Sequence, residues 1–168
     1  PKVDNSFIHE DIINTLTEQV KDKSKSDVEK KKLIKKLDSF VSELPSGNYK
    51  ILRHHKLAVA YYNLKDYINY KNISEKALNL SESIGDSLGI AKSYSYLGIY
   101  YRKTEQDNLA YENFYQAKKI LSSIKTDPSN QKQVAYYYGK VLIDLAQMLK
   151  NVKNYSESES LTVKAIKS

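Results

Sequence analysis

The chain has 168 residues and a formal net charge of +7, from 27 Lys and Arg against 20 Asp and Glu. It contains no Cys, which excludes disulfides, zinc–thiolate sites and thiol catalysis, and no run of about 18 apolar residues that could span a membrane. The basic excess is spread along the chain rather than gathered in one arm, which argues against nucleic-acid binding. Five Gly, three Pro and 40% hydrophobic residues favour helices over hairpins.

Residues 1–48 predict two amphipathic helices that form a first pair. The first helix covers 8–22, with apolar residues recurring on one face. The second begins near Asp27, an N-cap residue type, although Lys30 stands where a capping box would place an acid. The sequence PSGN at 45–48 ends it. Its apolar face consists of Leu33, Ile34, Leu37, Phe40, Val41 and Leu44.

Residues 49–85 predict a second helix pair. Leu57, Ala58 and Tyr61 share one face of its first helix. Gly85 is a suitable C-cap residue for its second helix. Asp86 is a suitable N-cap for a helix that begins near Ser87.

Residues 86–126 predict a third pair with the clearest pattern in the chain. Gly98 on its first helix and Ala110 on its second are small, so the two backbones can cross closely. The residues that surround this crossing are Tyr94, Leu97, Tyr101, Phe114 and Ala117. The order of an aromatic residue, Leu-Gly, Tyr, Ala, Phe and Ala resembles the tetratricopeptide repeat.

Residues 127–168 predict a last pair. Asp127 or Ser129 is expected to cap a helix of about 22 residues, with Pro128 in its first turn and its end near Asn151. A partner helix is expected from Tyr155. Because the chain ends inside this helix with an apolar face, we expect the parent protein to continue beyond Ser168, or another chain to cover this end.

The resemblance implies an all-α fold, a right-handed α-solenoid of antiparallel helix pairs with about eight helices. Residues 1–48 are then a degenerate first repeat or N-terminal cap, and 49–168 hold the recognisable repeats. Ala77 and Ala117 are 40 residues apart rather than the ~34 of the commonest repeat. Such extended repeats are similar to those of bacterial sensor kinases and helix-turn-helix transcription regulators.

The same resemblance implies where a partner would bind. In such arrays the first helix of each pair lines the concave surface, which here would suit an extended peptide or an acidic segment. We therefore predict a non-catalytic protein- or peptide-binding module of a signalling protein, with a self-association scaffold that forms a homodimer as the alternative. The predicted concave residues are His55, Val59, Tyr62, Lys92, Ser95, Ile99, Arg102, Lys140, Ile143, Gln147 and Lys150.

Other site types find little support in the sequence. One subclass of these repeats grips a C-terminal carboxylate with a set of Lys and Asn residues. Here the Lys positions hold His55, Ser95 and Ile143, and the Asn positions hold Val59, Ile99 and Gln147. That clamp is therefore absent. The adjacent His54 and His55 point about 100° apart on a helix and have no third ligand in register, so no metal site is predicted. Neither a nucleophile–base pair nor a Gly-rich phosphate loop is present, so we predict neither an enzyme nor a cofactor. The compartment, cytoplasmic or periplasmic, is left open.

Overall fold

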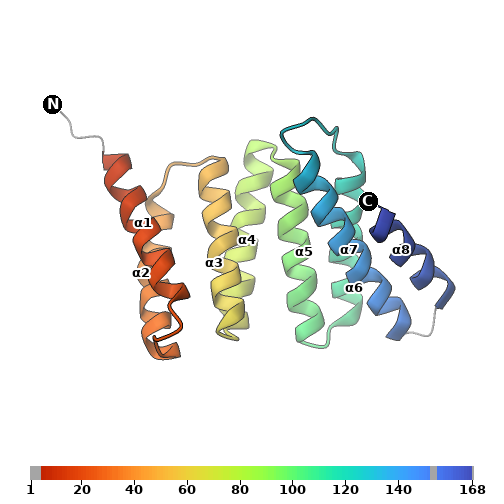
Figure 1. Ribbon diagram of the computed structural model, residues 1–168, viewed down its shortest axis with the longest axis horizontal. Coiled ribbons are helices and arrows are strands. Elements are labelled where there is room, and N and C mark those ends of the chain that lie inside the picture. Colours follow the sequence, from red (N-terminus) through yellow and green to blue (C-terminus); the bar gives the residue numbers. More distant parts are fainter. Residues whose placement is uncertain (1–4, 152–154, 168) are drawn as a thin grey trace. The chain divides into compact units, whose positions relative to one another are not determined.

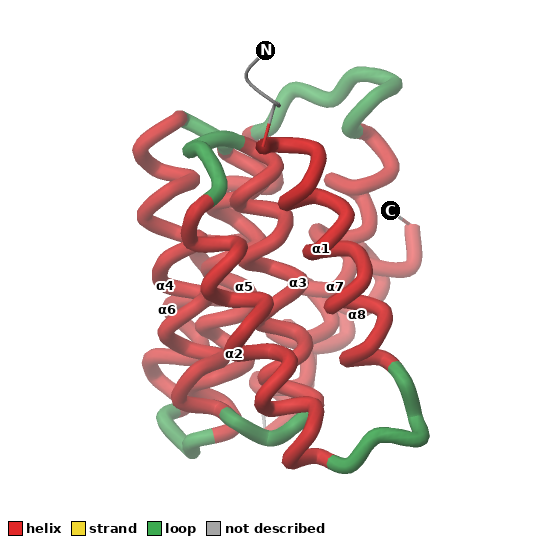
Figure 2. The backbone as a smooth tube through the Cα atoms, turned by 90° about the vertical axis from the view of Figure 1, so that its left-hand side faces the viewer, coloured by secondary structure: helices red, strands yellow, loops and turns green. Residues whose placement is uncertain are grey.

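The computed structural model describes residues 5–151 and 155–167, and the side chains of 9–150 and 161–167. Eight helices and no strand occur in these residues (Figures 1 and 2), which confirms the all-α prediction. The helices are α1 (Asn5–Lys21), α2 (Asp27–Glu43), α3 (Asn48–Asn63), α4 (Tyr67–Ile84), α5 (Ser87–Lys103), α6 (Asp107–Ser123), α7 (Gln131–Asn151) and α8 (Tyr155–Lys167). None of them, over the described residues, has the length and apolar character needed to cross a membrane.

The chain divides inside α4 into two compact units, Pro1–Ile73 and Ser74–Ser168. In the first unit α2 packs against both α1 and α3. The predicted apolar faces supply the core here. Its buried members are Ile13, Leu16, Ile34, Leu37, Val41, Leu44, Ile51, Leu57, Ala58, Tyr61, Tyr70 and Ile73.

The start of α2 differs from the prediction by one residue. Ser26, not Asp27, is the N-cap, and Glu29 rather than Lys30 therefore occupies the third helical position. The Glu29 N–H donates to Ser26 Oγ (3.3 Å), and the Ser26 N–H donates to Glu29 Oε2 (2.8 Å). The helix thus has a complete capping box, which is missed when Asp27 is taken as the N-cap.

In the second unit α5 pairs with α6 and α7 pairs with α8, while α7 also contacts α6 and α5. Consecutive helices run in opposite directions (Figure 1). The contacts are therefore consistent with stacked helix pairs. The core of this unit consists of Ala91, Ala110, Phe114, Ala117, Leu121, Val134, Val141, Leu142, Leu145, Ala146, Met148, Leu149 and Leu161.

Gly98 permits the close packing of α5 on α6, as predicted, but its neighbour is an aromatic ring. A Cβ atom placed on Gly98 would lie 2.8 Å from both Cδ1 and Cε1 of Phe114. Phe114 is fully buried, as are Ala110 and Ala117 on the same face of α6. The missing side chain of Gly98 therefore makes room for the Phe114 ring.

The turns that follow α3, α4 and α5 share one backbone motif. Lys65, Gly85 and Glu105 have φ values of 57°, 72° and 59°, in the left-handed region that ends many helices. The next N–H reaches back five residues in each turn, from Asp66 to Tyr61 (3.0 Å), Asp86 to Ser81 (2.9 Å) and Gln106 to Tyr101 (2.8 Å). Because Lys65 and Glu105 are 40 positions apart, the turn repeats with the same period as Ala77 and Ala117.

The remaining helix boundaries follow the prediction closely. Gly85 ends α4, and Asp86 caps α5 by accepting the N–H of Gly89 at Oδ1 (3.0 Å). The start of α7 is later than expected, at Gln131. Asp127 instead holds a turn over 128–130, because its Oδ1 accepts the N–H of Ser129 (2.7 Å) and of Asn130 (3.1 Å).

Candidate binding surface

The predicted concave residues lie in two units, with those of α3 in the first unit and those of α5 and α7 in the second. On α3 the His55 side chain is 2% exposed, which corrects the expectation that it faces a ligand. Tyr62 is half-buried, with its ring 5.7 Å from that of Tyr67 and 5.3 Å from that of Tyr70. Only Val59 of this group, 43% exposed, offers substantial surface.

On α5 the predicted residues are mostly half-buried between helices. Ser95 is 1% exposed and so cannot touch a ligand, a second correction. Lys92 lies over an aromatic ring of α7, with Nζ 4.8 Å from the centroid of Tyr137. Burial lowers the pKa of Lys92, while the negative charge of Asp86 opposes that shift.

Arg102 on α5 is already engaged with α7. Its Nη1 lies 2.7 Å from Asp144 Oδ1 and 3.5 Å from Gln147 Oε1. The guanidinium carbon lies 5.4 Å from the ring centroid of Phe114. Asp144 is 7% exposed, and its Oδ2 has no hydrogen-bond partner within the described part of the chain. The cation predicted to meet an acidic ligand is therefore neutralised within the fold.

Asp144 was not predicted, although the sequence holds a signal for it. It is the one charged residue in the apolar run VLIDLAQML of α7. A charge in such a run is rarely buried unless it is paired, so a basic partner on a neighbouring helix could have been sought.

The exposed part of α7 carries cations and apolar groups together. Ile143 is 47% exposed, Gln147 and Lys150 are exposed, and Lys140 is half-buried. Tyr136, also missed by the prediction, is 63% exposed. Together with the residues of α5 that face α7, these form a set that we call the α5–α7 surface: Lys92, Ile99, Arg102, Tyr136, Lys140, Ile143, Gln147 and Lys150.

Two tyrosines beside this surface connect α5 with α7. Tyr96 of α5 is buried and hydrogen-bonds with Tyr137 of α7. Burial raises the pKa of both phenols. Asp144 offsets Arg102, which leaves the three lysines as the surplus charge of the α5–α7 surface. The arrangement can bind a negatively charged, partly apolar chain by noncovalent contacts.

The described side chains offer little for other chemistry. Within 9–150 and 161–167, no three His, Asp or Glu residues are placed to hold a metal ion together. An open depression of about 290 Å³ lies on the first unit, lined by Asp11, Ile12, Thr15, Leu16, Gln19 and Lys36. Its lining has one acid and one base, so it favours neither ligand charge.

Comparison of the chain with protein-family models, with curated proteins and with solved structures gives no match. The resemblance to tetratricopeptide repeats therefore rests on the residues and turns described above.

Proposed function

We propose that this chain is a tetratricopeptide-like α-solenoid module that binds an acidic peptide segment on its α5–α7 surface. The single observation that carries the proposal is the surplus of lysine charge on that surface, next to exposed Ile143 and Tyr136. Exposed aromatic and aliphatic side chains supply contact area, and lysines supply complementarity to an acidic chain.

Two features support the solenoid part of the proposal. The turn motif at Lys65 recurs at Glu105, at the spacing expected of an extended repeat. Within the second unit the first helices of successive pairs, α5 and α7, contact each other, as stacking of helix pairs requires. The role as the sensory or regulatory region of a bacterial signalling protein rests on the resemblance of these long repeats alone.

A self-association scaffold is the second candidate, and α8 favours it. Val163 is 48% exposed and Ile166 is 80% exposed, three positions apart on one helix face. A second copy could cover this apolar face, so mass that rises with concentration in sedimentation equilibrium would favour it. Substitution of Ile166 by Lys should then restore the monomer.

The test of the peptide-binding proposal is selection from a random peptide display library on the immobilised chain. We expect acidic peptides to be enriched, and their affinity to fall at least tenfold in a Lys92→Glu/Lys140→Glu variant. The matched control is Lys76→Glu/Lys119→Glu, which reverses two charges on the exposed faces of α4 and α6. Equal losses in the two variants, or no acidic enrichment, would reject the α5–α7 surface as the site.

A further inference from the structure

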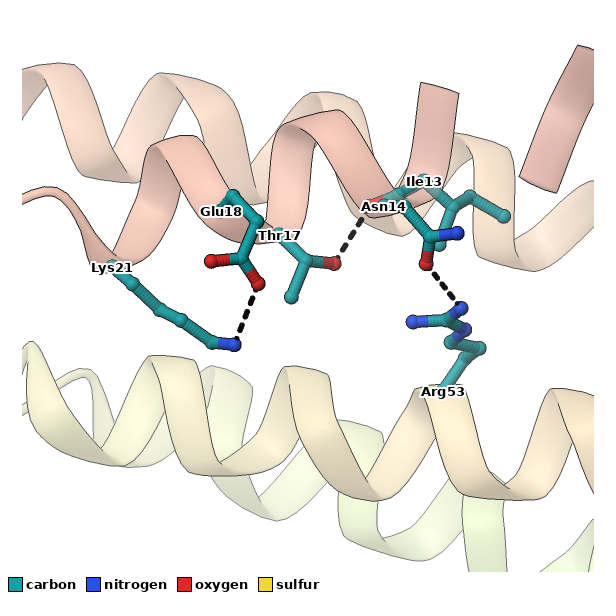
Figure 3. A network of polar contacts seen from close by, with 6 residues as sticks. All are labelled: Ile13, Asn14, Thr17, Glu18, Lys21 and Arg53. Carbon is teal, nitrogen blue, oxygen red and sulfur yellow. Dashed lines mark hydrogen bonds and ion pairs between the residues drawn. The ribbon is translucent and has the colours of Figure 1, made fainter. Parts of the chain in front are cut away.

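The first unit contains a nearly buried arginine whose hydrogen-bond partners among the described residues are all neutral. Arg53 on α3 is 8% exposed. Its Nη2 donates to Asn14 Oδ1 on α1 (2.6 Å) and to Tyr49 Oη on α3 (2.7 Å), as Figure 3 shows for Asn14. The guanidinium carbon lies 4.8 Å from the Tyr49 ring centroid. Nε is buried and has no hydrogen-bond partner among the described residues.

A buried charge without a counterion is unusual, because desolvation disfavours it unless an opposite charge pairs with it. α1 carries three acids within one turn of Asn14, namely Glu10, Asp11 and Glu18, but all three are exposed and none of them pairs with Arg53. Glu18 Oε1 lies 2.8 Å from Lys21 Nζ, and Figure 3 shows the Glu18 side chain turned toward Lys21 rather than Arg53. None of the described carboxylates pairs with Arg53. Arg53 therefore has the amide group of Asn14 at a position where a carboxylate would neutralise its charge.

The donors that remain define what could bind. Both hydrogen bonds of the guanidinium leave from Nη2, so the donors on Nη1 and Nε still lack an acceptor among the described residues. The Tyr49 hydroxyl accepts from Arg53, so its own hydrogen can be donated to a ligand. The ammonium group of Lys50 is held at the end of α2, where its Nζ donates to the carbonyl oxygens of Ser42 (2.7 Å) and Leu44 (2.9 Å).

We propose that Arg53 and Tyr49 form a binding site for the carboxylate group of a ligand. A single positive charge matches a monoanionic carboxylate better than a phosphate dianion. Tyr49 is 38% exposed and its ring lies over the guanidinium, so a ligand carboxylate would reach Arg53 beside this ring, where the Tyr49 hydroxyl can donate to it. The site is separate from the α5–α7 surface and does not depend on that surface binding a peptide.

The first experiment titrates the whole chain with sodium acetate at constant ionic strength, held by NaCl. The readout is the ¹H–¹⁵N signal of Arg53 Nε–Hε, which is assigned by its loss in Arg53→Lys. We expect a saturable shift with acetate and none with acetamide, which has the same shape without the charge. Equal responses to both, or no saturation, would overturn the proposal. A stronger response to inorganic phosphate than to acetate would overturn the assignment of a carboxylate.

A second variant tests the missing counterion directly. Asn14→Asp places a carboxylate beside Nη2, so acetate affinity should fall at least tenfold while the melting temperature rises. The control Asn72→Asp adds the same charge at an exposed position of α4 and should bind acetate as the wild type does. Wild-type acetate binding in Asn14→Asp would show that Arg53 does not lack a counterion.

The source of the carboxylate is resolved by two further probes. N-acetylglycine offers a C-terminal carboxylate, and the α-amide of N-acetylglutamate offers a side-chain carboxylate. The probe that binds more tightly than acetate identifies the source. If neither shifts the Arg53 signal, the site does not take a peptide carboxylate and the proposal fails.

Discussion

Replacement of Gly98 by Ala tests the packing of α5 on α6 with the smallest possible change. The added Cβ would lie 2.8 Å from two atoms of the Phe114 ring and 3.0 Å from its Cγ. Ordinary carbon contacts are about 3.5–4.0 Å, so the ring or the helix must move by roughly 0.7 Å. Phe114 is 0% exposed and surrounded by core residues, so the ring has no free space to enter.

The two opposing contributions to the free energy of unfolding have known sizes. Overpacking a core by one carbon costs about 1–3 kcal/mol. The same substitution removes a helical Gly, which stabilises a helix interior by roughly 0.5–1 kcal/mol. We therefore expect a net loss of about 1–2 kcal/mol.

The chain supplies its own control in Gly139 on α7. Among the described residues, a Cβ there would meet the carbonyl oxygen of Ala165 alone, at 3.6 Å, which is an ordinary contact. Gly139→Ala should therefore be neutral or stabilising in a urea titration followed by circular dichroism. Phe114→Leu should make Gly98→Ala less costly than it is in the wild type. Equal effects of the two Gly→Ala changes would refute the packing argument.

Three further predictions concern charge and capping. Arg102→Met leaves the buried carboxylate of Asp144 unpaired and should cost about 2 kcal/mol in urea denaturation, at the low side of buried pairs because Arg102 is partly exposed. Asp144→Leu added to it should recover most of that loss, whereas additive losses would contradict the pairing. Burial, helped by Asp38 and Asp66, raises the pKa of Tyr61 to about 12; the folded state then keeps a proton that the unfolded state loses near 10, so stability should fall from pH 10 to 12. Tyr61→Phe should flatten that fall, and an unchanged profile would exclude Tyr61 as its source. Ser26→Ala should cost about 1 kcal/mol, as loss of a capping box does, and no cost in thermal unfolding would count against the cap.

The sequence predicts the helices of this protein well because periodicity and end signals are local. The apolar face of α6 is buried as expected, and that of α2 is buried except for the half-buried Leu33 and Phe40. Asp86 caps α5 as predicted, by accepting the N–H of Gly89. The errors at helix starts are local as well. Ser26 and Asp27 are both good N-caps, but the Ser-x-x-Glu spacing of 26–29 already favours Ser26 in the sequence, and the hydrogen bonds of Glu29 agree with it.

The candidate surface is harder to predict because burial depends on neighbouring helices. His55 and Ser95 stand one position from the apolar face of their helices, about 100° around the axis. Periodicity alone leaves such a position open to solvent, yet each is at most 2% exposed. The first helix of a pair packs on more than one neighbouring helix. A wider part of its circumference is therefore buried than would be buried by contact with one helix alone.

The buried Arg53 and the half-buried Arg102 show why ligand chemistry depends on the structure rather than on residue type. Arg102 meets Asp144, 42 positions away, while Arg53 meets Asn14, 39 positions away. The sequence separations are almost the same, and both pairs join one helix to the next helix but one. The difference between a carboxylate and an amide at the partner decides what each arginine can still bind. Arg102 is neutralised and ties α5 to α7, whereas Arg53 keeps its charge and two donor groups. An acidic ligand should therefore compete poorly at Arg102, which the sequence favoured, and well at Arg53.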